Sequence, residues 1–146
     1  VSAFLLTRSS DLSLAYKGVA GTIAIAVIVL VVCAIIPLLI VGNQEPEITI
    51  TDQQMQISGI YGNDYNLSDI ESVTLQDECP VTTFKTNGFA MGKIKKGHFN
   101  VQNDGNSLLF LSGSGKCIRI KTKSDIIYIN FADEIVTMDL YGKLVK

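Results

Sequence analysis

Two hydrophobic patterns follow one another along the chain. Residues 20–42 read AGTIAIAVIVLVVCAIIPLLIVG, a run that contains no charged side chain. After Asn43 the pattern changes to short stretches in which apolar and polar residues alternate, as in EITIT and QMQISGI. Alternation with a period of two is typical of β-strands that bury one face. The sequence therefore predicts one long apolar helix followed by a mainly β domain.

The apolar run is long enough for a transmembrane helix. At ~1.5 Å per residue it can cross a hydrocarbon core of ~30 Å. A cleaved signal peptide fits less well, because its apolar core spans only roughly 7–15 residues. A lipoprotein processing site in LVVC is also disfavoured, because bulky Val32 precedes Cys33 and the apolar run continues beyond it. We interpret the run as a single membrane anchor.

The predicted organisation has four parts. Residues 1–19 form a juxtamembrane segment, which an upstream piece could precede because the chain begins with Val1. Residues 20–42 are the anchor and residues 43–46 are a polar linker. Residues 47–146 are long enough for one small domain with one core.

Basic residues flank the anchor unevenly. Arg8 and Lys17 precede it, whereas the first basic residue after it is Lys85. The positive-inside rule then places the N-terminal flank in the cytoplasm. We therefore expect a single-pass protein whose domain lies on the extracytoplasmic side.

The sequence of residues 47–146 predicts a series of short antiparallel strands joined by turns. Glycine and asparagine in NDGN and GSGK supply the backbone conformations that tight hairpin turns need. The predicted strands lie within 47–51, 54–60, 65–67, 70–78, 81–86, 98–103, 107–112, 117–123 and 126–131.

The tail ADEIVTMDLYGKLV switches to helical spacing. Ile135, Met138 and Tyr141 are expected to share the buried face of this helix, with Leu144 next along. An amphipathic terminal helix of this kind would close the open end of a bent sheet or barrel.

Charge and cysteine content narrow the classes of partner. Residues 43–146 carry ten Lys and Arg and thirteen Asp and Glu, so their formal charge is −3. This balance argues against nucleic acid, which requires a basic face. Cys79 and Cys117 are the cysteines of this part, and two isolated cysteines fit neither a CxxC metal site nor a disulfide scaffold. We expect buried thiols, with a Cys79–Cys117 bridge as the alternative in an oxidising compartment.

Three blocks resemble the bacterial pleckstrin-homology-like domains found in small bacterial membrane proteins. They are a strand pair at 48–62, the step LSDIESV at 67–73 and, most specifically, KTNGFAMGKIKKGHF at 85–99. The resemblance continues through IRIKTK, IYINF and the final helix, so it covers about 47–146. Lys85 stands where the family commonly has arginine, which keeps the charge but loses the bidentate geometry.

The resemblance implies a strongly bent antiparallel β-barrel of about seven strands, which a C-terminal helix closes at one end. It also implies a location at the bacterial cell membrane. It implies less about function, because the same scaffold binds lipids, peptides and proteins.

The segment TNGFAMGKIKKGHF offers little catalytic chemistry. We interpret His98, the chain's only histidine, as a structural residue whose ring bonds to nearby loop carbonyls, with a proton acceptor or phosphate contact as the alternative. A single histidine makes no metal site. GFAMGK also lacks the spacing and the following hydroxyl residue of a phosphate-binding loop. The sequence therefore predicts no enzyme, no cofactor and no metal.

The same segment is the candidate contact surface. Its basic residues could line one loop and contact an anion or a partner, and a lysine near an anionic bilayer contributes about 1 kcal/mol. The alternative is a solvated loop whose lysines protect a strand edge. The candidate contact residues are Lys85, Lys93, Lys95, Lys96 and His98. The residues expected to serve loop geometry are Asn87 and Gly88, as a turn, together with Gly92 and Gly97.

These observations predict a non-enzymatic, membrane-anchored binding or scaffolding module. We expect it to contact another envelope protein or a second copy of itself. The alternative is an anionic lipid head group or membrane surface that the lysines contact.

Overall fold

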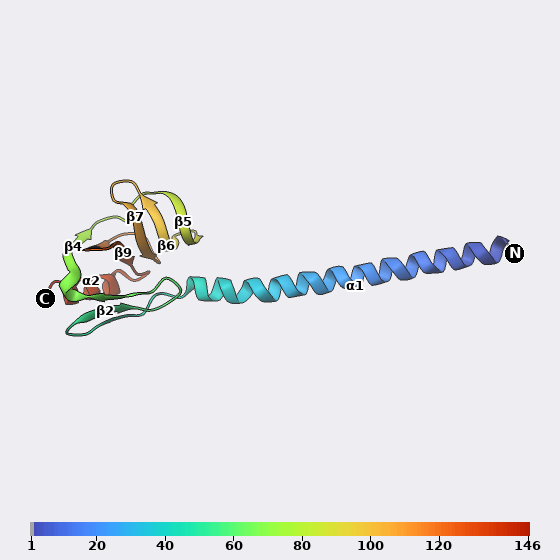
Figure 1. The fold of residues 1–146 in the computed structure, drawn as a ribbon, viewed down its shortest axis with the longest axis horizontal. Helices are drawn as coiled ribbons and strands as arrows, with labels where there is room; N and C mark the ends of the chain where they lie inside the picture. The colour runs from blue at the N-terminus through green and yellow to red at the C-terminus, as the bar shows by residue number, and fades with distance from the viewer. Residues whose placement is uncertain (1) are drawn as a thin grey trace. The chain divides into compact units, whose positions relative to one another are not determined.

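The computed structural model describes the backbone of residues 2–146 and the side chains of residues 16–146 (Figure 1). The chain divides into two compact units, one that ends at Val41 and one that extends from Gly42 to Lys146. We refer to the second unit as the domain.

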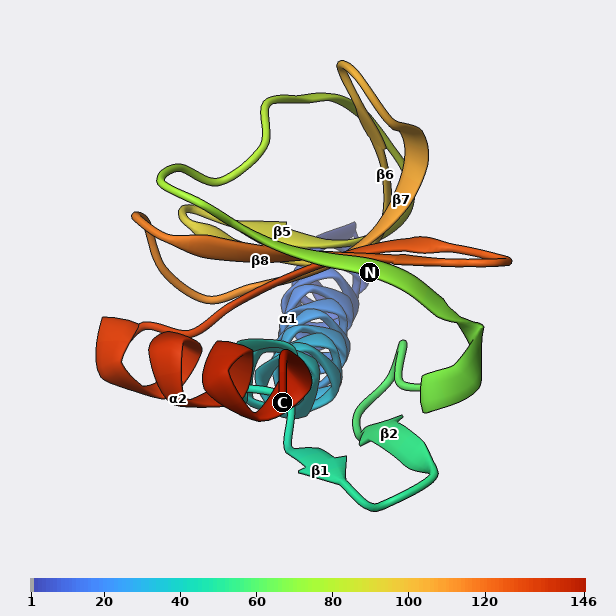
Figure 2. The ribbon, with the colours of Figure 1, turned by 90° about the vertical axis from the view of Figure 1, so that its left-hand side faces the viewer.

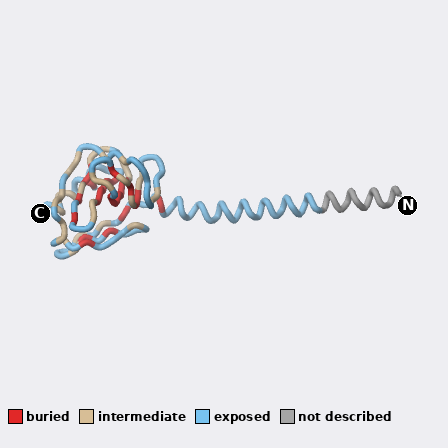
Figure 3. Tube along the Cα trace, turned by 45° about the horizontal axis from the view of Figure 1, so that its top comes forward, coloured by how far each residue is buried: buried red, intermediate tan, exposed pale blue. Residues whose placement is uncertain are grey.

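Helix α1, Ser2–Asn43, is apolar over most of its described side chains. Its segment Tyr16–Asn43 contains an 18-residue window with a mean hydropathy of 3.4 and is long and apolar enough to cross a membrane, criteria that a signal sequence near an N-terminus also meets. The side chains from Tyr16 to Val41 are all exposed (Figure 3). A helix with an apolar exterior and internally satisfied backbone is what a lipid environment accepts. α1 is therefore a candidate membrane anchor.

The domain consists of nine strands and one α-helix in the part of the chain that the structure describes. The strands are β1 (Ile48–Ile50), β2 (Gln54–Ile57), β3 (Asp64–Asn66), β4 (Ile70–Gln76), β5 (Thr82–Met91), β6 (Ile94–Val101), β7 (Gly105–Leu111), β8 (Cys117–Thr122) and β9 (Ile126–Asn130). A 3-10 turn, Leu67–Asp69, precedes β4, and helix α2, Glu134–Leu144, ends the domain.

The strands form two sheets, one of three strands in the order β1-β2-β3 and one of six in the order β4-β8-β9-β7-β6-β5. Neighbouring strands are antiparallel except β7 and β9, which are parallel because the β8–β9 hairpin returns to place β9 beside β7. Figure 2 shows the six-stranded sheet above, with α2, β1 and β2 below it. The predicted mainly β fold with a C-terminal helix is confirmed.

The six-stranded sheet buries side chains on both faces. On β7, Leu108 and Phe110 enter one hydrophobic cluster, while Leu109 and Leu111 enter another. Burial on both faces explains why SLLFLS is continuously apolar instead of alternating. The first cluster holds Met55, Ile57, Tyr65, Leu108, Phe110, Ile118, Ile120, Ile127, Ile129, Phe131 and Leu140. The second cluster holds Phe99, Val101, Leu109, Leu111, Cys117 and Tyr128.

Helix α2 turns a different face to the core than the hydrophobic pattern predicted. Thr137 and Leu140 are buried, whereas Ile135 is 76% exposed and Met138 is 38% exposed. Tyr141 packs against the first cluster, as expected. The prediction was wrong for Ile135 and Met138, whose apolar side chains form part of the outer surface.

The start of α2 sets this orientation. Asp133 caps the helix, since its carboxylate accepts a hydrogen bond from the Ile135 N–H (2.8 Å). The hydroxyl Oγ1 of Thr137 accepts one from the Phe131 N–H (3.1 Å) and is held against the end of β9. Helical spacing then directs Leu140 inward. Thr137 is thus buried in the core, where the hydrophobic pattern had predicted Ile135 and Met138.

Candidate functional site

The segment TNGFAMGKIKKGHF forms a β-hairpin rather than a loop. β5 extends to Met91, β6 begins at Ile94, and the turn between them contains Gly92, whose φ of 59° favours glycine. The predicted Asn87–Gly88 turn is wrong, because both residues pair with β6 inside the ladder. Lys85, Lys95, Lys96 and His98 therefore lie on strands and Lys93 lies in the turn, so these residues do not line one loop.

Two opposed glycines let the hairpin strands approach closely. Gly88 pairs directly with Gly97, whose φ is 105°. A Cβ at Gly97 would lie 2.6 Å from the Asn87 carbonyl oxygen, and one at Gly88 would lie 2.5 Å from the Lys96 carbonyl oxygen. Both positions therefore exclude a side chain, so these glycines serve backbone geometry in a strand pair.

The candidate lysines point in different directions. Lys95 and Lys96 are adjacent on β6, so their side chains leave opposite faces of the strand. Lys95 Nζ donates a hydrogen bond to Thr82 Oγ1 (2.8 Å). Lys93, in the hairpin turn, donates one from Nζ to Ser114 Oγ (3.2 Å).

Lys96 lies in a row of side chains that crosses the sheet. Phe89 on β5 and Phe110 on β7 are its direct neighbours across the strands. The row continues through Ile129 on β9 and Ile118 on β8. The aliphatic stem of Lys96 thus packs where the neighbouring positions are apolar, and the residue is only 7% exposed.

The Lys96 ammonium donates a hydrogen bond to the backbone carbonyl of Gln44. Burial lowers the pKa of Lys96, because a low-dielectric surrounding disfavours the charged form, and the nearby Glu45 carboxylate partly opposes this shift. No ion pair of Lys96 is present among the described side chains. The site therefore contains a buried cation that a backbone carbonyl satisfies in part.

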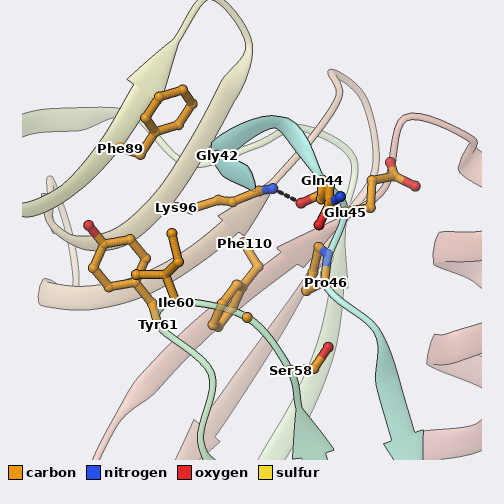
Figure 4. Close-up of a pocket in the computed structure, with 11 residues that line it drawn as sticks. Gly42, Gln44, Glu45, Pro46, Ser58, Ile60, Tyr61, Phe89, Lys96 and Phe110 are labelled. Carbon is orange, nitrogen blue, oxygen red and sulfur yellow. Dashed lines mark hydrogen bonds between the residues drawn. The ribbon is translucent and has the colours of Figure 1, made fainter. Parts of the chain in front are cut away.

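A pocket of about 190 Å³ surrounds this ammonium (Figure 4). Figure 4 shows the Lys96 side chain extending to Gln44, with Phe89 on one side and Ile60 and Tyr61 on the other. The remaining apolar walls come from Phe110 and Pro46. The pocket can hold a small group that combines an apolar part with an acceptor or negative charge for the ammonium.

The last turn of α1 and the residues that follow it form one wall of this pocket. Gly42 and Pro46 are buried, and a Cβ at Gly42 would lie 2.9 Å from the Phe89 ring. Glu45 Oε1 accepts a hydrogen bond from the Ala132 N–H (2.7 Å). The expected linker is therefore attached to the domain at several points.

β5 is an edge strand of the six-stranded sheet and exposes much of its length. Residues 83–87 are all exposed, and Phe84 is 58% exposed. The pairing with β6 shifts between Thr82 and Phe84 and again between Lys85 and Asn87. Such irregularities bend a strand and restrict the partners that can pair with it.

The comparison with known families identifies the domain. A family model described as bacterial PH domain matches residues 46–134, more than half of the chain. This chain belongs to the bacterial PH domain family. Curated proteins and solved structures give no significant match. PH-like domains are in general non-catalytic binding modules, so the family supports a binding role.

The opposite face of the PH domain carries a shallower surface. Lys93 and Lys95 border it, but Asp77 and Glu78 do so as well, and their carboxylates offset the two positive charges. Cys79 lies on the same surface. The structure thus divides the predicted basic residues between two sites, and Lys85 lies with neither because it is exposed on β5.

His98 is partly buried on β6 and pairs in register with Asn87 and Leu108. Its backbone carbonyl accepts a hydrogen bond from Thr86 Oγ1 (2.9 Å), whereas its imidazole makes no hydrogen bond to the side chains and backbone that the structure describes. The predicted bonds from the ring to loop carbonyls are therefore absent, because the residue stands in a strand and not in a loop.

The strongest polar network of the PH domain escaped the sequence analysis. Arg119 binds Asp104 through two hydrogen bonds of 2.7 and 2.8 Å, and the Tyr128 hydroxyl donates to the same carboxylate. Arg119 holds the pKa of Asp104 below its usual range, while burial and this carboxylate raise the pKa of Tyr128 to about 12. The network fixes the β6–β7 turn to β8 and β9. The NDGN motif marked a turn but carried no signal of its distant partners.

Proposed function

We propose that the protein is a membrane-anchored, non-enzymatic module that binds an extended protein segment along the free edge of β5. The observation that carries this proposal is the exposure of residues 83–87 on an edge strand with an exposed phenylalanine, Phe84, among them. The family supports a binding role of this general kind.

The edge supplies both affinity and selectivity. Unpaired backbone N–H and C=O groups on the outer side of β5 can form a ladder with an added strand. Phe84 and Val81, which is 66% exposed, add apolar contact area. The two irregularities and Lys85 oppose pairing with an arbitrary strand. A partner must therefore match a bent and partly charged edge.

In this proposal residues 20–42 anchor the domain, which extends from about residue 47 and faces the extracytoplasmic side. Anchoring in one membrane raises the local concentration of partners in the same membrane. The occupant is then a segment of another envelope protein or of a second copy.

Site-specific photocrosslinking in living cells tests this proposal. A photoreactive amino acid replaces Phe84 in one full-length variant and Ile135, exposed on α2, in a matched control. We expect a discrete adduct from position 84 whose mass identifies a second copy or another protein. The adduct should disappear when Thr86, on the same edge, is also changed to proline. Equal adducts from both positions, or none from position 84, would contradict the proposal.

A second candidate function is binding of an anionic lipid head group. It is favoured by the buried Lys96 ammonium, which lies in a pocket with Gly42, in the last turn of the apolar helix. Lys85, Lys93 and Lys95 could add attraction to an anionic surface.

The lipid that stays bound to the purified chain tests this second function separately from binding at the β5 edge. The full chain is transferred from nanodiscs of equal phosphatidylglycerol and phosphatidylcholine into mild detergent, and the retained lipid is weighed by native mass spectrometry. Selective retention of phosphatidylglycerol that Lys96→Met abolishes and Lys85→Met preserves supports the candidate. Equal retention by all three chains excludes a head-group site at Lys96.

A further inference from the structure

The two cysteines of the domain come together although they are far apart in the sequence. Cys79 lies in the connection between β4 and β5, and Cys117 is the first residue of β8. Cys117 is a fully buried member of the second hydrophobic cluster, and Cys79 packs against that cluster. Cys117 pairs in register with Gln76, three residues before Cys79, and Cys79 Sγ lies 3.7 Å from the carbonyl oxygen of Gly115, two residues before Cys117. The fold therefore brings together two thiols that are far apart in the sequence, and no local spacing of cysteines reveals the pair.

The two thiols have different surroundings. Cys117 is wholly enclosed, and its Sγ contacts the Ile129 carbonyl oxygen at 3.4 Å. Cys79 is partly exposed on the open surface that Lys95 also borders. As a thiol, Cys79 can donate to the carbonyl oxygen of Gly115 (3.7 Å). Only Cys79 is therefore accessible to a reagent from solvent.

The electrostatic surroundings match this difference in access. The neighbouring Cys117 thiol and the positive charge of Lys95 lower the pKa of Cys79, although its partial burial opposes them. The neighbouring Cys79 and burial raise the pKa of Cys117. Since the thiolate is the nucleophile, Cys79 is the thiol that attacks first.

We propose that Cys79 and Cys117 are a reversible disulfide-forming pair, in which Cys79 attacks a disulfide oxidant and Cys117 resolves the product. The Cys79 thiolate displaces one thiolate from the oxidant R–S–S–R and forms the mixed disulfide Cys79–S–S–R. Cys117 then loses its proton and attacks Cys79 Sγ, which releases the second thiolate. The two cysteines are oxidised, and the oxidant is reduced to two thiols.

The bond would link the N-terminal end of β5 to β8, two strands that do not pair with one another. The connection before β5 would be tied to the start of β8, since Cys79 lies close to the first residue of β5, Thr82. Oxidation would thus fix the N-terminal end of the exposed edge strand. This inference rests on the thiol pair alone and does not require a partner on β5.

Oxidised glutathione tests the assignment on the full chain in detergent. Cys33, in the apolar helix, is replaced by serine in all chains so that it does not react. The Cys33→Ser chain should lose two hydrogen atoms by intact mass and retain no glutathione. Adding Cys117→Ala should leave one stable glutathione adduct. Adding Cys79→Ala instead should leave a chain that reacts at least roughly tenfold more slowly.

The Cys33→Ser chain alone keeps the test decisive, because it leaves the domain unchanged. If it ends with two free thiols, or with a lasting glutathione adduct, the proposal is overturned. The same chain unfolded in guanidinium provides the reference, since both thiols should then react at similar rates. A Cys79→Ala chain that reacts as fast as the parent when folded would overturn the assigned roles of the two thiols.

Discussion

The ammonium of Lys96 reaches the backbone carbonyl of Gln44 from within a row of otherwise apolar side chains. This contact attaches the residues that follow the apolar helix to the β5–β6 hairpin. A buried cation with a carbonyl partner contributes little net stability, because desolvation offsets the hydrogen bond. Its clearer effect is to fix the position of the segment that begins the domain.

Replacing this cation with an apolar side chain of similar length separates its effect on stability from its effect on the position of residues 43–45. Lys96→Met should leave the free energy of unfolding unchanged or raise it by about 1 kcal/mol, because the desolvation cost disappears. The backbone amides of residues 43–45 should exchange faster with deuterium, because the hydrogen bond from Lys96 to the Gln44 carbonyl is lost. Lys95→Met, on the other face of β6, is the control and should leave this exchange unaltered. A large loss of stability in Lys96→Met would contradict the prediction.

The Asp104–Arg119 pair should make the domain sensitive to acid. Because hydrogen bonding to Arg119 lowers the pKa of Asp104 in the folded state, the pair stabilises the fold above the unfolded aspartate pKa of about 3.9. This contribution is lost as the pH falls below that value through the folded-state pKa. Denaturant titrations between pH 7 and pH 3 measure it.

Asp104→Asn should cost about 3 kcal/mol at pH 7, because Arg119 is left without its carboxylate. It should also flatten the acid dependence between pH 5 and pH 3. Asp139→Asn, which removes an exposed pair with Lys143 on α2, is the control and should change neither result. An unaltered acid profile in Asp104→Asn would show that other carboxylates dominate.

The hairpin glycines provide a test of close strand approach. Gly97→Ala should destabilise the domain by more than about 3 kcal/mol, because a Cβ would lie 2.6 Å from the Asn87 carbonyl oxygen at a φ of 105°. Gly105→Ala is the matched control, since Gly105 has a φ of 68° with open space around it. It should cost only about 1 kcal/mol of backbone strain. Equal losses of unfolding free energy would contradict the packing argument.

The orientation of α2 is open to the same kind of comparison. Leu140→Ala should cost about 2–5 kcal/mol, because Leu140 is only 6% exposed within the first cluster. Ile135→Ala should stay within about 0.5 kcal/mol, because that side chain is 76% exposed. Unfolding of the full chain in detergent, followed by circular dichroism, gives both values. A larger loss of unfolding free energy in Ile135→Ala than in Leu140→Ala would contradict this orientation and support the buried face that the hydrophobic pattern predicted.

The sequence predicts those features that depend on local pattern. The apolar helix, the first strand pair of the domain, β1–β2, and the C-terminal helix follow from periodicity and length. The family followed from the block at 85–99. The buried face of α2 could not be predicted in this way, because the buried hydrogen bond between Thr137 and Phe131 determines it.

The candidate site was predicted less well because it depends on contacts between distant residues. The lysines were grouped by proximity in the sequence, but strand alternation sends Lys95 and Lys96 to opposite faces. Gln44 meets Lys96, and Cys79 meets Cys117, only when the sheet has folded. No local motif marks such pairs.

Hydrogen–deuterium exchange along β5 tests the central claim most directly. An added strand would protect the amides of residues 82–88 that face away from β6, whereas the free edge leaves them to exchange with water. The full chain is compared in native membrane vesicles and after purification in detergent, with residues 70–76 of β4, the other sheet edge, as the control. The account predicts that β5 exchanges at least roughly tenfold more slowly in the native membrane while β4 is unchanged. Equal exchange of β5 in both preparations would contradict it.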